Sequence, residues 1–316
     1  MKYLSVAGHI LTLLAVAFFL ILAVETPEAF SQISLTLQST MALLIGCLIC
    51  VVATGVGGTV WFLVLRAIDQ KVSWSGAISV VFVSQAAKYV PGNVAHHIGR
   101  VVLANRSGIA VNVALFAMLV EFAWLIGVAA ILAVIYLHAL GNESLAGNYL
   151  SDGWWVLSLV VLTAASAPAV GHRLMERGIR WWARRKSIEA KSVPFPSTKS
   201  LSISGVLYFF NFLIFGLLIY FLAEQIFGSR DADILALTGI FALSWVIGFI
   251  SPGAPAGLGI RELVLVAGLT PFYGKEVAIG LAGMLRVTTV FGDLLTFVIG
   301  LVISRKIKRH SAVAKN

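Results

Sequence analysis

A proline-glycine pair followed by an arginine occurs twice in this chain, each time within sequence that is otherwise apolar. In both copies seven residues separate the glycine from the arginine, and the copies are Pro91-Gly92 with Arg100 and Pro252-Gly253 with Arg261. Proline breaks the hydrogen-bond ladder of a helix, and lipid offers no partner to the freed backbone groups or to an arginine. Matched breaks beside matched charges therefore indicate a duplicated core that handles a charged group at membrane depth.

The composition places most of this core in a lipid bilayer. Hydrophobic residues make up 59% of the 316-residue chain, charged residues make up 12%, and the mean hydropathy is +0.95. A soluble fold of this length cannot bury so much apolar surface, and we therefore predict an all-α polytopic membrane protein. The net charge of +9 does not indicate nucleic-acid binding, because the basic residues gather in a few segments between apolar runs, as membrane topology requires.

Six apolar runs are long enough to cross a hydrocarbon core of about 30 Å at about 1.5 Å per helical residue. They comprise residues 5–24, 41–65, 111–138, 153–170, 201–223 and 277–304. No Ala-x-Ala site follows the first run, and we expect it to be a retained span and not a cleaved signal peptide.

The segments between these spans alternate in charge. The basic ones are the N-terminus, residues 66–73, the linker 171–200 and the C-terminal tail, and the acidic ones are 25–40, 139–152 and 224–233. Basic loops remain in the cytoplasm, so we expect both termini to be cytoplasmic in the cell (inner) membrane. Apolar side chains among the arginines of the linker predict a short helix that lies on the anionic cytoplasmic leaflet.

The two Pro-Gly copies lie in stretches that these six spans leave over, residues 74–110 and 234–270. Charge bias requires both ends of the first stretch to be cytoplasmic and both ends of the second to be outside. The economical prediction is two re-entrant hairpins that enter from opposite faces with Pro-Gly near each tip, giving about eight membrane elements in one domain, 1–316. Alternatively, each pair of legs crosses completely, which gives ten spans with the same orientation.

The spans that flank the two hairpins also correspond. One half covers about residues 41–138 and the other about 201–304, and the two halves run in opposite directions across the membrane. Inverted repeats with broken helices at matched positions are typical of transporters, whose substrate site lies at the breaks. We therefore predict the substrate site at the two hairpins.

Charged side chains supply the candidate binding residues. Arg100 and Arg261 each offer a planar fork of donors that matches a phosphate, and each follows a glycine-bearing break where backbone N–H groups also favour an anion. The remaining candidates for the same site are Lys88, Pro91, Gly92, Pro252, Gly253 and Glu262. For a polar path or gate the candidates are Glu121, Arg286, Asp293, His96 and His97.

Purely structural roles stay open for several of these residues. Arg286 and Asp293 could pair with other helices and lock the bundle, and Glu121 could be a counter-ion to Lys88 or Arg100 without any substrate contact. The pair His96-His97 could be a polar lining. Neither histidine has a further histidine or carboxylate at helical spacing, so we expect no metal, and we expect no cofactor, since no phosphate-cradling loop or dinucleotide fingerprint occurs.

Two motifs resemble a known family. They are the run from Ser84 to Gly92 with His97-Ile98-Gly99-Arg100, and the run from Ala256 to Glu262. Both are similar to the transmembrane region of lysylphosphatidylglycerol synthases, and the resemblance covers nearly the whole chain. It implies an integral membrane protein with inverted repeats. In family members that also carry a synthase domain, this region is expected to move an aminoacylated phospholipid between leaflets. Only twelve residues follow the last expected span here, so we expect no lysyl transfer and no enzymatic activity.

The expected function is translocation of a lipid with a phosphate headgroup, either a phospholipid or a polyprenyl-phosphate-linked glycan. Without an ATP site, movement is expected to be downhill or ion-coupled, and Glu121 and Asp293 are the candidate proton carriers. One alternative is a non-transporting scaffold for a glycosyltransferase or lipid-modifying enzyme that acts through the linker 171–200. Another alternative is a membrane enzyme that acts on lipid-linked sugars, for which Glu262 beside Arg261 is the candidate catalytic carboxylate.

Overall fold

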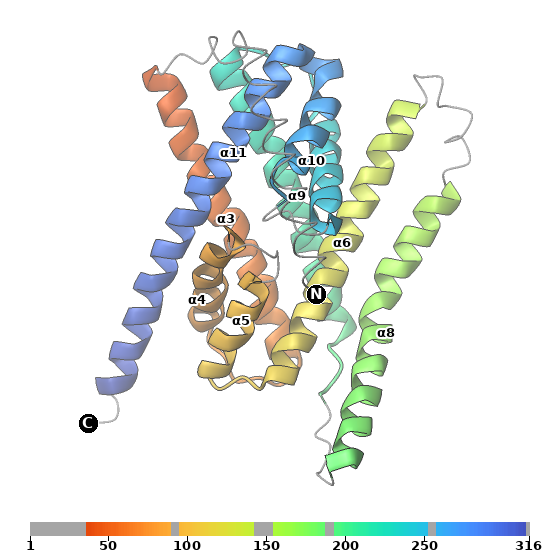
Figure 1. Cartoon of the computed structure of the whole chain (residues 1–316), viewed down its shortest axis with the longest axis vertical. Helices are drawn as coiled ribbons and strands as arrows, with labels where there is room; N and C mark the ends of the chain where they lie inside the picture. The colour runs from red at the N-terminus through yellow and green to blue at the C-terminus, as the bar shows by residue number, and fades with distance from the viewer. Residues whose placement is uncertain (1–35, 90–94, 142–153, 187–192, 252–256, 314–316) are drawn as a thin grey trace, which may run out of the picture.

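The computed structural model describes residues 36–89, 95–141, 154–186, 193–251 and 257–313, and the regular structure within these ranges is helical (Figure 1). The first expected span, 5–24, and the residues Pro91, Gly92, Pro252 and Gly253 lie outside the described residues. The elements are α3 (Leu37–Ala67), α4 (Trp74–Ser84), a 3₁₀ turn (Gln85–Tyr89), α5 (Ala95–Arg106), α6 (Val111–Gly141), α8 (Trp154–Lys186), α9 (Thr198–Phe227), α10 (Ile234–Ile250) and α11 (Ile260–Val313).

Short polar side chains begin several of these helices. The Thr36 and Ser39 side chains form a reciprocal capping box at the start of α3, and the Ser73 hydroxyl accepts a hydrogen bond from the Gly76 N–H at the start of α4. At α10 the Asp233 carboxylate accepts from two backbone N–H groups. Each cap satisfies donors that the first helical turn leaves open, which fixes where the apolar run enters helical geometry.

Four described helices, α3, α6, α9 and α11, are long and apolar enough to cross a membrane, and α10 is a shorter apolar helix. The chain is therefore a multi-pass, all-helical membrane protein within the described ranges. These helices coincide with the expected spans at 41–65, 111–138, 201–223 and 277–304. The expected span at 153–170 is the first half of α8, which is not among the four.

Two helices continue past the boundaries that the sequence predicted. The linker from residue 171 was expected to leave the span, but α8 runs without interruption to Lys186, through Pro168 and Gly171. Conversely, α11 begins at Ile260 and is interrupted only at Gly274, whose φ of 76° and ψ of 162° are non-helical. A glycine tolerates this backbone conformation, so α11 consists of a short helix, 260–273, and a long one, 275–313.

The short helices lie at different levels of the bundle. In Figure 1 α4 and α5 occupy the lower half of the molecule and α10 the upper half, while α3, α6, α9 and α11 run along both. α4 packs against α3 and α11, and α10 packs against α9, α6 and α11. Glycines allow the closest of these contacts, because a Cβ at Gly300 would collide with the backbone of α4 and one at Gly239 with Tyr136 of α6.

Candidate functional site

A cavity of about 230 Å³ lies where the short helices meet the long ones. α3, α4, the 3₁₀ turn, α5, α6, α9, α10 and α11 all contribute side chains to its wall. The charged and histidine residues that line it are Lys88, His96, His97, Arg100, Glu121, Arg261, Arg286 and Asp293. Side chains predicted from separate stretches of the sequence are thus brought together in one place, and Glu262 joins them through Arg286.

Arg100 and Glu121 form the most enclosed ion pair of the cavity. Nη1 of Arg100 donates to Oε1 of Glu121 at 3.0 Å, and Nη2 lies 2.7 Å from Oε2. The Arg100 guanidinium also lies over the Trp61 ring, 4.1 Å from its centroid. Trp61 is completely buried, and sequence reasoning did not select it. Glu121 is therefore a counter-ion to Arg100, as one of the open alternatives proposed, and the pair joins α5 to α6.

Glu262 has two partners at the start of α11. One carboxylate oxygen accepts a hydrogen bond from the Gly259 N–H at 2.6 Å, and the other lies 3.5 Å from Nη1 of Arg286. Gly257 and Gly259 both have positive φ, 70° and 84°, which turns the chain sharply into the helix. The negative charge in the first helical turn is favourable for the helix dipole, so Glu262 stabilises this helix start and holds Arg286 against it.

Lys88 and Asp293 form a more accessible pair. Nζ of Lys88 lies 3.1 Å from Oδ1 and 3.3 Å from Oδ2 of Asp293, and the exposed fraction of the lysine side chain is 31%. The pair connects the end of the 3₁₀ turn to the last long helix, two elements that are 205 residues apart in the chain. Because it is more exposed than the Arg100–Glu121 and Arg286–Glu262 pairs, its partners are the easiest to exchange for a ligand.

Arg261 reaches the cavity between two glycines and an aromatic ring. Its guanidinium lies 5.3 Å from the centroid of the Phe241 ring. A Cβ at Gly248 or at Gly257 would collide with the aliphatic part of the Arg261 side chain. Gly248, which no sequence motif marked as a candidate, is thus needed for the position of this arginine.

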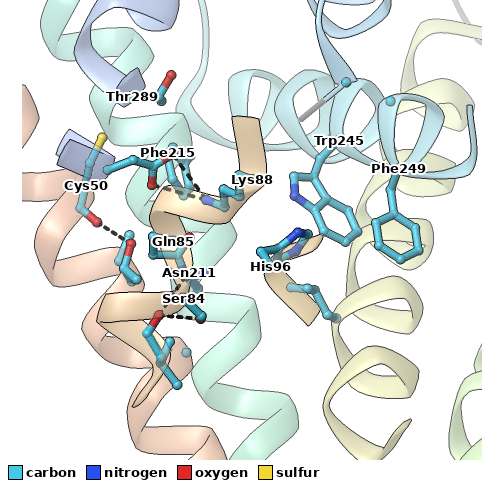
Figure 2. A pocket seen from close by; sticks show the side chains of 18 of the residues that line it. Cys50, Ser84, Gln85, Lys88, His96, Asn211, Phe215, Trp245, Phe249 and Thr289 are labelled. Carbon is cyan, nitrogen blue, oxygen red and sulfur yellow. Dashed lines mark hydrogen bonds and ion pairs between the residues drawn. The ribbon is translucent and has the colours of Figure 1, made fainter. Parts of the chain in front are cut away.

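One side of the cavity is aromatic. Trp245 and Phe249 of α10 are stacked, with ring centroids 5.0 Å apart and an interplanar angle of 12°, and Phe122 of α6 lies 5.8 Å from Phe249. The His97 ring meets Phe122 edge-on at 4.7 Å. Figure 2 shows Trp245 and Phe249 on one side of the cavity, Cys50 and Thr289 on the other, and Lys88 between them. Sequence reasoning missed this wall, because aromatic residues in an apolar helix resemble ordinary core.

His96 and His97 lie side by side at the cavity, with ring centroids 3.6 Å apart. Among the described residues no group of three or more His, Cys, Asp and Glu side chains could hold a metal ion. Both histidines line the cavity, and the geometry of the described residues assigns them no further role.

Comparison with known families assigns the chain from its sequence. No curated protein matches it. The model of one family, described as the lysylphosphatidylglycerol synthase TM region, matches residues 6–296 and so includes every residue of the cavity. Since the match covers most of the 316 residues, this chain belongs to the lysylphosphatidylglycerol synthase transmembrane-region family.

Proposed function

We propose that this protein is a lipid translocase that moves a lipid with a phosphate headgroup across the cytoplasmic membrane. Its family is related to lipid modification or transport. The observation that carries the proposal is the convergence of Lys88, Arg100, Arg261 and Arg286 on one cavity inside a bundle of apolar helices. Charged side chains at such depth are rare unless they serve a substrate path, and arginine and lysine are the usual ligands of phosphate.

The ion pairs suggest different roles for these four cations. Arg100 and Arg286 are each held by a buried carboxylate and act as fixed positive charges in the wall. Lys88 and Arg261 are the residues that we assign to the phosphate. On arrival of the headgroup, the phosphate replaces Asp293 as the partner of Lys88, so that the lysine exchanges one anionic partner for another.

The packing supports an inverted repeat with re-entrant breaks. In the first half α4 and α5 follow α3 and precede α6, and in the second half α10 and residues 260–273 follow α9 and precede the long part of α11. The short helix α4 packs on α11, and its counterpart α10 packs on α6, while α3 packs on α9. Each half therefore places its broken element against the last helix of the other half, as expected for two halves that rock about a shared site.

Labelling of single cysteines at positions 91 and 252 tests the opposed hairpins. In a Cys47→Ala/Cys50→Ala background, a membrane-impermeant maleimide should label Pro91→Cys from the cytoplasmic side and Pro252→Cys from the outside, because the two hairpins are proposed to enter the membrane from these opposite faces. The control is a cysteine in place of Arg230, in the acidic segment after α9, which should label from outside. Labelling of both tips from one side alone would contradict the inverted arrangement.

Lys88 and Asp293 test the exchange of ion pairs in the proposed transport. Lys88→Ala should slow movement of a headgroup-labelled phospholipid in proteoliposomes about tenfold, because a charge-assisted hydrogen bond to the phosphate is lost. Asp293→Asn should instead bind phosphatidic acid several-fold more tightly, since the competing carboxylate is removed.

The matched control is Lys275→Ala, an exposed lysine beside the Gly274 turn that does not line the cavity. Equal transport by Lys88→Ala and the wild type, with weaker lipid binding by Asp293→Asn, would mean that the pair only locks the bundle. Absence of any lipid movement above empty liposomes in the wild type would reject the translocase itself.

A further inference from the structure

Several polar atoms of the cavity wall have no hydrogen-bond partner in the described part of the chain. Four of them are Oε1 of Gln85, Nδ1 of His96, Nδ1 of His97 and Oδ1 of Asn211. These atoms come from the 3₁₀ turn, α5 and α9, which surround the same space. Buried polar groups in native proteins are nearly always paired, so four open ones around one cavity indicate a ligand that supplies partners.

Two of these atoms determine what the ligand must offer. Gln85 is 9% exposed, and its Nε2 donates to the Val81 carbonyl at 3.4 Å, which leaves Oε1 for the cavity. Oδ1 of Asn211 is likewise an amide oxygen. Amide oxygens only accept hydrogen bonds, so the ligand must carry donors, whereas the Nδ1 atoms of His96 and His97 can pair with either kind of group.

The charges of the site favour hydroxyl donors over an ammonium group. Four cations, Lys88, Arg100, Arg261 and Arg286, stand against three carboxylates, Glu121, Glu262 and Asp293, which gives 4 − 3 = +1. A further positive charge on the ligand is disfavoured in this surplus, but a neutral hydroxyl is not. The stacked rings of Trp245 and Phe249 add a flat apolar surface, suited to the C–H face of a saturated ring.

The size of the cavity limits the ligand further. Its volume of about 230 Å³ is below the range of roughly 300–1,000 Å³ that is usual for drug-sized ligands. The space enclosed by the described residues therefore fits one ring and a phosphate, not an oligosaccharide.

From these contacts we infer that the headgroup is a phosphorylated polyol, a single sugar or inositol ring joined to the lipid through phosphate. This inference rests on the proposed function and names its substrate class. Lys88 and Arg261 hold the phosphate, and Gln85, Asn211 and the two histidines hold the ring hydroxyls. Sites built to pair with a substrate hydroxyl strongly reject analogues that lack it, so the ring determines selectivity.

Binding to the full-length protein in nanodiscs tests this inference with four probes. The probes are phosphatidylinositol, a polyprenyl phosphate glucose, phosphatidylethanolamine and phosphatidic acid, compared by native mass spectrometry. At least one of the two ring-bearing lipids should bind about tenfold or more tightly than phosphatidylethanolamine and phosphatidic acid. Preference for phosphatidylinositol assigns the ring to a diacyl lipid, and preference for the glucose lipid assigns it to a polyprenyl carrier.

Variants separate the ring contacts from the phosphate contacts. Gln85→Met and Asn211→Leu should each reduce the preference for the ring about tenfold and leave the affinity for phosphatidic acid unchanged. The matched control is Gln38→Met, since Gln38 is an exposed glutamine of α3 outside the cavity, paired with Gln225. Equal binding of all four lipids would overturn the polyol assignment and leave the translocase standing, whereas no binding of any lipid would overturn both.

Discussion

Arg100→Gln is expected to lower the free energy of unfolding by about 3–5 kcal/mol, because it leaves the Glu121 carboxylate buried without its cation. The exposed side-chain fractions of the two residues are only 7% and 8%, and nitrogen–oxygen distances of 3.0 and 2.7 Å join the two groups. The substitution also removes the cation–π contact of the guanidinium with the Trp61 ring, which contributes about 0.5–2 kcal/mol. Thermal and denaturant unfolding of the purified protein in one detergent measures the effect.

The double variant Arg100→Gln/Glu121→Gln identifies the origin of this loss. Removing both charges leaves no uncompensated ion, so the double variant should be more stable than either single one. As a control, Arg230→Gln should change stability by less than about 1 kcal/mol, because Arg230 pairs with Glu224 at the surface, where its side chain is 68% exposed. If the single and double losses simply add, Arg100 and Glu121 do not depend on one another in the folded state.

Arg261→Ala is expected to reduce lipid transport about 10- to 100-fold. A charge-assisted hydrogen bond contributes about 1.5–3 kcal/mol, and the planar guanidinium presents two donors to one phosphate. Arg261→Lys should retain part of the rate, because it keeps the charge but not the fork of donors. Initial rates of movement of a headgroup-labelled phospholipid in proteoliposomes, at equal protein content, give the comparison.

Gly248→Ala offers an independent test of the same position. The added Cβ would collide with the Arg261 side chain and displace it without removing its charge, so transport should fall although every charge is kept. The paired control is Gly178→Ala, because an added Cβ at Gly178 meets no atom within 4 Å. Transport at the wild-type rate by folded Arg261→Ala and Gly248→Ala proteins would show that this arginine does not hold the phosphate.

The course of the chain followed closely from local chemistry. The second broken stretch, residues 234–270, forms α10 and the first part of α11. Their limits were readable because Asp233 caps α10 and glycines precede Ile260. The end of α8 was misjudged, because a change from apolar to basic residues at position 171 marks a change of surroundings and does not by itself end a helix.

The sequence predicted many of the residues of the candidate site, but it did not predict which of them form ion pairs with one another. An ionisable residue within an apolar run is conspicuous, so Lys88, Arg100, Glu121 and Arg261 could be selected from the sequence. Which carboxylate faces which cation depends on how helices cross, and the Lys88–Asp293 pair joins residues 205 positions apart. Trp245 and Phe249 are not conspicuous in this way, because aromatic residues are common in apolar helices and only the tertiary structure shows that these two line the cavity.

The sequence by itself determined that this chain is a helical membrane protein, where most of its described helices lie, and that charged residues occur within its apolar segments. Those properties depend on hydropathy, helix breakers and capping residues, all of which act over a few positions along the chain. Only the tertiary structure decided that these charges pair with one another around one cavity with an aromatic side. Pairing and shape depend on distances between segments far apart in the chain, and the packing of whole helices sets those distances.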